Sequence, residues 1–203
     1  MNRAAMFAIV AGAAACGGSK DSAPEAPAGP SFTQGTIDAA ACNALLPTPL
    51  RDKIIFEKRQ IIEKRGRSAT TYTVAAPKSW KQDMDSFADL KADKSGGFFS
   101  SFRVGSNCDG MCTAKDWDKI VDKATFQPLL KDAKVLKDVR GAGTRTVIVE
   151  DNSNTKSTRI TTAWWKTGDK KYYLCSAELD PEVRDAAPAF ERACSALTVD
   201  GDD

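Results

Sequence analysis

Three consecutive stretches decide the fold: TRTVIVE (144–150), STRITTAWWK (157–166) and KKYYLCSAEL (170–179). Each is rich in β-branched and aromatic residues, and apolar and polar positions alternate along it, as they do in half-buried strands. The polar segments between them, 151–156 and 167–170, have the length of hairpin loops. The sequence therefore predicts an antiparallel meander of three strands.

More strands are predicted on the N-terminal side of this meander. Residues 54–63 and 70–76 flank the charged turn 65–68, and the second of them opens with the alternating TTYTV. The stretch FFSSFRV (98–104) follows the glycine pair 96–97. Together with the meander, these segments predict an antiparallel β-sheet of about five to six strands.

Helices are predicted to cover this sheet, which makes the fold class α+β. Apolar spacing indicates helices over 37–54, 84–92 and 117–135, with breaks at the prolines within the first and the third. The last helix is predicted to begin at the N-cap residue Asp180, with Pro188 as a kink or a restart. Its apolar stripe comprises Val183, Ala186, Ala187, Phe190, Cys194 and Leu197.

The order of these elements resembles the PsbP-like fold, an architecture that bacterial lipoproteins such as DcrB share. The resemblance covers roughly residues 54–198 and includes the Pro77-x-x-Trp80 corner after the second strand. In addition, CNALL (42–46) is similar to the Cys-x-x-Leu-Leu helix that opens the mature domain of small lipoproteins. The resemblance implies a binding or assembly module and no catalysis, although the cysteines of this chain depart from the family's pattern.

The N-terminus resembles a bacterial lipoprotein signal. Residues 1–3 carry one positive charge, residues 4–15 are apolar or small, and Cys16 follows directly. The apolar run is shorter than the ~20 residues that a transmembrane helix needs. We therefore expect a signal peptide over 1–15 and lipidation at Cys16, although Ala13 replaces the usual Leu of the family. Ordinary secretory cleavage at the same bond and an uncleaved leader are the alternatives.

The remaining chain divides into a tether, a domain and a tail. Residues 16–35 hold prolines among Gly, Ser and Ala and show no apolar periodicity, so they are predicted to form a lipid-anchored, extended tether. Residues 36–199 are long enough for a single α/β domain with its own core, and 200–203 are predicted to be a disordered acidic tail. The anchor predicts an exported protein of the bacterial cell envelope, facing the periplasm or the cell surface.

Six cysteines favour an oxidising compartment over the cytosol. If Cys16 is lipidated, an odd number is left, and we predict two disulfides, Cys108–Cys112 and Cys175–Cys194. Cys42 is then free or buried. A Cys42–Cys194 bridge is the alternative, because both residues could lie on helices over the same sheet.

The absence of histidine excludes Ser-His and Cys-His nucleophile pairs and His-bearing zinc sites. Only Arg3 is charged before Cys16, so the exported chain would have a net charge one below the +2 of the whole sequence, too small for a typical nucleic-acid binder. We therefore predict no catalytic residue, no metal site, no cofactor and no nucleic-acid partner.

Two groups of residues are candidates for a binding surface. Trp164 and Trp165 are neighbours on a strand and point to opposite faces, so that one belongs to the core and the other is exposed or covered by a second element. An exposed tryptophan would suit a partner anchor. The second group is a basic cluster that would either contact anionic headgroups or form a solvated hairpin edge. It comprises Lys58, Arg59, Lys64, Arg65 and Arg67.

These features predict a membrane-anchored envelope lipoprotein that acts as a binding or assembly module. Its expected partners are the lipid bilayer, through the anchor, and an envelope protein. A thiol-redox or hydrolytic envelope enzyme and a purely structural envelope protein are the alternatives.

Overall fold

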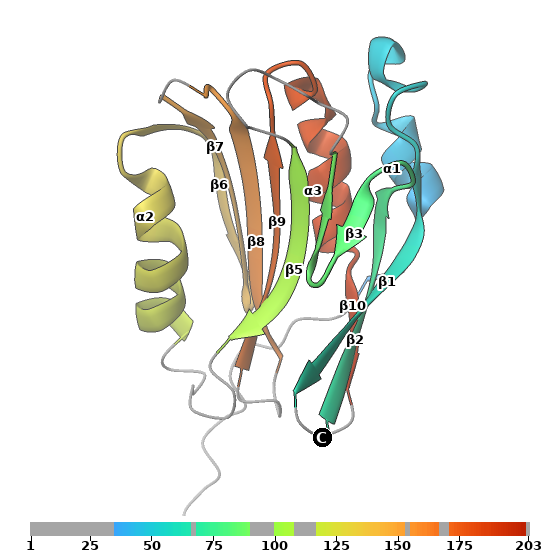
Figure 1. The fold of residues 1–203 in the computed structure, drawn as a ribbon. Coiled ribbons are helices and arrows are strands. Elements are labelled where there is room, and N and C mark those ends of the chain that lie inside the picture. Colours follow the sequence, from blue (N-terminus) through green and yellow to red (C-terminus); the bar gives the residue numbers. More distant parts are fainter. Residues whose placement is uncertain are drawn as a thin grey trace, which may run out of the picture.

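The chain forms two β-sheets with helices packed on them (Figure 1). The structure is a computed structural model and describes residues 35–65, 68–89, 100–107, 117–152, 155–166 and 171–201. Its helical elements are α1 (Ala39–Ala44), η1 (Thr48–Leu50), η2 (Trp117–Phe126), α2 (Gln127–Leu130), η3 (Arg184–Ala186) and α3 (Ala187–Ser195). Its strands are β1 (Phe56–Arg65), β2 (Ser68–Pro77), β3 (Lys81–Asp83), β4 (Ser86–Ala88), β5 (Ser101–Asn107), β6 (Ala133–Gly141), β7 (Thr144–Asp151), β8 (Thr158–Lys166), β9 (Lys171–Leu179) and β10 (Thr198–Gly201).

Several predicted features lie outside the described residues. They are the signal peptide 1–15, the lipidation site Cys16, the tether up to residue 34, the Cys108–Cys112 pair and Arg67.

The predicted meander is confirmed as three antiparallel strands, β7, β8 and β9. They lie within a seven-stranded sheet of order β3-β4-β5-β9-β8-β7-β6. The register places Thr162 opposite both Thr146 and Cys175. The meander therefore supplies three adjacent strands of the seven-stranded sheet.

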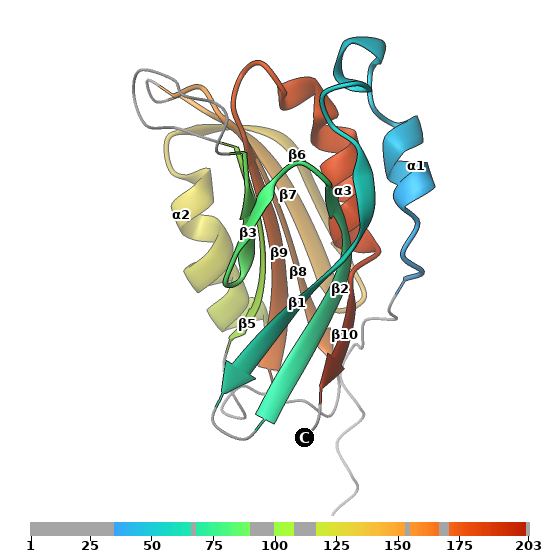
Figure 2. The ribbon, with the colours of Figure 1, turned by 45° about the vertical axis from the view of Figure 1, so that its right-hand side comes forward.

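The predicted single sheet of five to six strands is wrong in extent, because the strands divide into two sheets. The strand pair predicted at 54–63 and 70–76 is confirmed as β1 and β2, but it belongs to a separate three-stranded sheet of order β1-β2-β10. Figure 2 shows this small sheet in front, with α1 beside α3.

Three segments form strands that the sequence did not predict. A helix was expected over 84–92, but the first residues of this range belong to the β3–β4 hairpin. Met84 lies in the turn of the hairpin, with φ 38°. The helix expected over 117–135 ends at Leu130, because Asp132 at φ 60° reverses the chain into β6. The predicted acidic tail starts too early, since β10 runs through Asp200 to Gly201 and pairs with β2.

The C-terminal helix begins later than predicted. Asp180 does accept a hydrogen bond from the backbone N–H of Glu182 at 2.8 Å, but a turn and the short η3 follow it. Pro188 stands in the first turn of α3, where its missing N–H costs no helical bond. The sequence predicted that Pro188 would either kink the helix or restart it, and the structure shows a restart.

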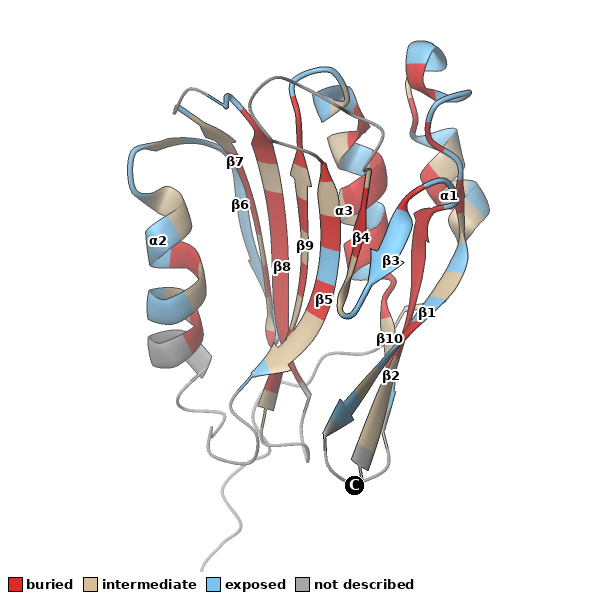
Figure 3. Cartoon of the chain, in the orientation of Figure 1, coloured by how far each residue is buried: buried red, intermediate tan, exposed pale blue. Residues whose placement is uncertain are grey.

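Two hydrophobic cores lie on opposite faces of the seven-stranded sheet (Figure 3). The larger core fills the space between this sheet, α3 and the three-stranded sheet, and Phe190 contacts the rings of Phe56, Trp80 and Phe102 within it. The smaller core lies under η2 and α2. Each strand of the meander therefore contributes alternate side chains to different cores.

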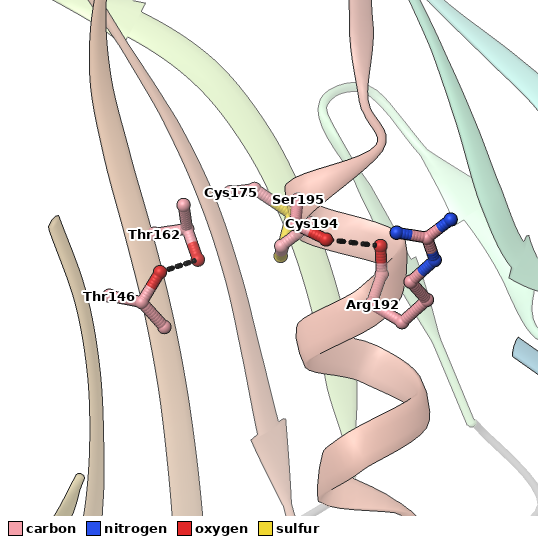
Figure 4. Close-up of a disulfide and its surroundings, with 6 residues drawn as sticks. All are labelled: Thr146, Thr162, Cys175, Arg192, Cys194 and Ser195. Atoms are coloured by element: carbon pink, nitrogen blue, oxygen red, sulfur yellow. Dashed lines mark hydrogen bonds between the residues drawn. A yellow bond between two sulfur atoms is a disulfide. The ribbon is translucent and has the colours of Figure 1, made fainter. Parts of the chain in front are cut away.

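A disulfide joins the sheet to the helix over the larger core. Cys175 of β9 is bonded to Cys194 of α3, as predicted (Figure 4). Cys42 of α1 is a free thiol with no exposed surface, so the alternative Cys42–Cys194 pairing is wrong. Burial raises the pKa of the Cys42 thiol to about 11, which keeps it protonated and unreactive at neutral pH.

The double substitution Cys175→Ala/Cys194→Ala should destabilise the protein. With a sequence separation of 19, the disulfide closes a loop whose lost unfolded-state entropy is worth about 3 kcal/mol. In a chain of this size that corresponds to a melting temperature lower by roughly 6–12 °C. Thermal unfolding without reductant, followed by circular dichroism, measures the shift.

Cys42→Ala is the control, because it removes a buried thiol and no cross-link. We expect a clearly smaller shift from it. Equal shifts in the two variants would show that the cross-link itself contributes nothing beyond the buried sulfur atoms.

Candidate binding groove

Among the described residues, helices cover only part of one face of the seven-stranded sheet. On this face η2 and α2 cover large side chains of the meander, including Val147, Trp165 and Tyr172. The same face continues across β8, β9 and β5, and there the helix leaves it open. The register gives successive rows across these strands, with Arg103 next to Ser176 and Ser176 next to Thr161.

The open part of the face is a groove of about 500 Å³. Small residues form its base: Gly105 on β5, Ser176 on β9 and Thr161 on β8. A Cβ atom added at Gly105 would find no other atom within 4 Å. Thr125 of η2 and Leu129 of α2 line the groove on the helical side. The groove therefore exists because side chains are small where the helix is absent.

Charges of both signs line the groove and are paired. Arg159 donates to Glu178 at 3.0 Å, and the hydroxyl of Ser157 donates to the same carboxylate at 3.1 Å. Arg103 lies 3.8 Å from Asp85, and both of these side chains are at least half exposed. The groove carries no net charge from these four ionised groups, so it favours neutral or zwitterionic ligands over strongly charged ones.

A buried polar contact fixes one end of the groove. Ser100, which precedes β5, donates its hydroxyl to Asp180 at 3.1 Å and accepts the backbone N–H of Asp180 at 3.0 Å. Because Asp180 follows β9, the contact holds the start of β5 against the end of β9. Ser101, next to Ser100, and Glu178, two residues before Asp180, face each other in the sheet and line the groove.

A cluster of charges around Arg145 fixes the helix that borders the groove. Arg145 of β7 is 7 % exposed and donates to both carboxylate oxygens of Asp138 on β6, at 2.9 and 2.7 Å. It also donates to Asp122 of η2 at 2.8 Å and lies over the ring of Phe126, 4.4 Å from its centroid. Arg140 pairs with the same Asp122. This Arg145 cluster therefore joins η2 to β6 and β7.

Within the Arg145 cluster, the pKa values of Asp138 and Arg145 shift in the directions that favour their charged forms. Hydrogen bonds from Arg145 lower the pKa of Asp138, against the opposing effect of burial. Hydrogen bonds to Asp138 raise the pKa of Arg145. The folded protein therefore favours the ionised pair.

The tryptophans predicted as a surface are both buried. Trp164 is 1 % exposed in the larger core, where it stacks with Tyr173, and Trp165 is 4 % exposed under the helix of the smaller core. They do point to opposite faces, as predicted. Of the two alternatives for the second tryptophan, exposure and cover by a second element, the structure shows cover, so neither residue is an exposed anchor.

The predicted basic cluster divides between the interior and the surface. Arg59 donates to the backbone oxygens of Pro77 and Trp80 at 2.9 and 2.7 Å and lies over the ring of Phe87. Burial lowers its pKa. Arg59 thus holds the Pro77-x-x-Trp80 corner and is no part of a basic surface, whereas Lys58 and Lys64 are exposed.

The residues that line the groove were not predicted from the sequence. One signal was present, since Gly105 interrupts a strand pattern, which often marks a close approach or an open face. The small polar residues Thr161 and Ser176 gave no distinct signal, because they fit the solvent side of any half-buried strand.

No protein-family model matches the chain, and no curated protein is significantly similar to it. Within the described residues, no helix combines the length and apolarity needed to cross a bilayer. Nor does this part of the chain hold a cluster of three or more His, Cys, Asp or Glu side chains able to bind a metal ion.

Arg145→Met should destabilise the domain by about 2 kcal/mol, because it leaves the carboxylates of Asp122 and Asp138 without their shared partner. The effect is smaller than for a fully buried pair, since the two acidic side chains are 26 % and 36 % exposed. The folded pKa of Asp138 is lowered, so its contribution is fully present above the unfolded pKa near 4 and is lost as pH falls through the folded value. The difference in the free energy of unfolding between the wild type and Arg145→Met should therefore become smaller at acidic pH. Urea unfolding at several pH values measures it.

Arg103→Met is the matched control, because its exposed pair with Asp85 should contribute less than about 1 kcal/mol. If the free energies of unfolding of the wild type and Arg145→Met differ by the same amount from neutral pH to well below pH 4, the ionised Asp138 carboxylate does not contribute to stability as proposed.

Proposed function

We propose that the protein is a lipid-anchored binding module of the bacterial cell envelope, and that its groove holds an extended peptide segment of another envelope protein. The observation that carries this proposal is the open groove across β5, β9 and β8, with small residues at its base and the fixed helix beside it. The proposal includes no catalytic step.

A peptide fits the chemistry of the groove. An extended backbone needs donors and acceptors in alternation, and hydroxyl and amide side chains such as Ser101, Asn107 and Ser176 supply both. The two ion pairs at the groove, Arg103 with Asp85 and Arg159 with Glu178, offer charges of either sign to the side chains of a peptide. Leu129 adds apolar contact on the helical side. The cavity volume lies within the ordinary range of ligand sites.

The position of the N-terminus agrees with a tethered domain. Gly35, the first described residue, packs against the end of α3, where an added Cβ would lie 3.0 Å from the Cα of Ala196. The expected tether therefore joins the domain at a fixed point beside α3, away from the residues that line the groove.

The lipid anchor is tested by detergent partitioning after expression in a bacterial host. We expect the wild type in the detergent phase and Cys16→Ser in the aqueous phase, because only a lipidated Cys16 would supply a hydrophobic anchor. Cys42→Ala should partition as the wild type does. If wild type and Cys16→Ser both remain in the aqueous phase, the anchor is disproved.

The groove is tested with peptides and a substitution that fills it. A display library of random short peptides is selected against the chain carrying Cys16→Ser, and enriched peptides are titrated into it by calorimetry. Gly105→Leu should weaken their binding at least ~10-fold, because the new side chain occupies the base of the groove. Its melting temperature should not fall, since the added Cβ meets no neighbour and leucine favours a strand more than glycine does.

Ser79→Leu, at an exposed turn after β2, is the control and should bind peptides as the parent does. Enriched peptides that bind Gly105→Leu and the parent equally would place the binding site elsewhere.

A further inference from the structure

β6 is the last strand of the seven-stranded sheet, and it is exposed along almost its whole length (Figure 3). The helices on the two faces of the sheet reach this strand with charged side chains: Glu191 of α3 pairs with Lys137, and Asp122 of η2 pairs with Arg140. Among the described residues, no further strand lies beyond β6 in the sheet. The outer side of β6 is therefore an edge that another strand can extend.

The second half of β6 is more regular than the first. A bulge between Val135 and Lys137 interrupts the pairing with β7, whereas each residue from Lys137 to Gly141 has one partner on β7. A bulge twists an edge strand away from a further partner. Residues 137–141 are therefore the part of the edge that can pair with another strand.

The hydrogen-bond pattern of the sheet shows which residues of this segment direct their backbone groups outward. The carbonyl oxygen of Gly143, just before β7, accepts a hydrogen bond from β8. Because the pattern alternates along a strand, Thr146 of β7 bonds instead to β6, where its partner is Val139. The backbone N–H and C=O groups of Asp138 and Arg140 on β6 therefore point to the outer edge.

The charges of this segment select one register for a second copy of β6. Two copies related by a two-fold axis pair antiparallel, and the outward residues face one another when the axis passes beside Asp138, Val139 or Arg140. The first and the last of these registers bring two like charges directly opposite each other, which is unfavourable. The register centred on Val139 places Asp138 of each copy opposite Arg140 of the other. The segment is therefore complementary to itself in charge and in hydrogen bonding.

We infer that two copies of the chain associate through the outer edges of β6, with Val139 at the two-fold axis. Asp138 of each copy exchanges backbone hydrogen bonds with Arg140 of the other, and the two side chains attract each other across the interface. Val139 is 51 % exposed and contacts its counterpart at the axis. Lys137 lies opposite Gly141 of the other copy, where the missing side chain leaves room for the lysine.

This dimer keeps both grooves open. A two-fold axis between antiparallel strands of one sheet is perpendicular to the sheet, so η2 of both copies lies on the same side. The groove extends across β5, β9 and β8, and β7 separates it from β6. Two grooves on one side suit a partner with two peptide segments, because binding of the first raises the effective concentration of the second. This consequence rests on the proposed function, whereas the association of the strands does not.

The test uses the chain carrying Cys16→Ser, so that no lipid anchor contributes, in sedimentation velocity at concentrations up to about 1 mM. The paired segment is short, so we expect a dimer that dissociates on dilution. Val139→Lys and Val139→Glu should each weaken the dimer at least ~10-fold, because each places two like charges opposite each other at the axis. An equimolar mixture of the two variants should dimerise again, because the axis then brings opposite charges together.

Val135→Lys is the matched control. It adds the same charge to an exposed position of β6 before the bulge, and it should dimerise as the parent does. Thermal unfolding followed by circular dichroism checks that each variant folds, which we expect because both valines are about half exposed.

A parent chain that stays monomeric, an equal loss in Val135→Lys and Val139→Lys, or a mixture of the two Val139 variants that stays monomeric would overturn the inference. So would a dimer that Val139→Lys leaves intact, since another surface would then hold the two copies. Gly105→Leu should dimerise as the parent does, so a failure here leaves the groove proposal standing.

Discussion

The structure depends on the two-sided burial of its central strands. β8 and β9 lie between neighbours on both sides in the sheet and between two cores across it. Adjacent residues therefore have different surroundings, as Trp164 and Trp165 demonstrate. A shift of register by one residue would exchange the two faces and place small polar side chains in the larger core. The hydrogen-bonded register of the meander thus decides where every covering element can pack.

The two faces are held by different interactions. On the side of α3, an aromatic core around Phe190 is fixed by a disulfide between strand and helix, and the hydroxyls of Thr146 and Thr162 pair on the neighbouring strands (Figure 4). On the side of η2, the core is smaller and the helix is joined to the sheet through the Arg145 cluster. Within the part of the chain that the structure describes, η2 and α2 cover the second face where large side chains lie, and the groove lies beside them.

The sequence predicted the elements whose signals are local. Alternation identified β7, β8 and β9, and the apolar stripe with Cys194 identified the helix that the disulfide fixes. The strand β6 was missed because Leu129, Leu130 and Val135 continue a helical spacing, and the reversal at Asp132 is a single left-handed residue. The short β3, β4 and β10 were missed because they depend on pairing with distant strands, which no local pattern encodes.

The candidate site was harder to predict than the fold for a related reason. Side-chain size follows helical coverage: Trp165 and Tyr172 lie under η2 and α2, whereas Thr161, Ser176 and Gly105 lie beyond them. Each of these residues is ordinary for its own strand, and only the register places the small ones in adjacent rows. Arg145 of β7 lies under η2 and is not among the residues that line the groove; its ion pairs hold η2 over β6 and β7. The groove is therefore a property of the assembled sheet, and its residues become recognisable as a site only after the strands are aligned.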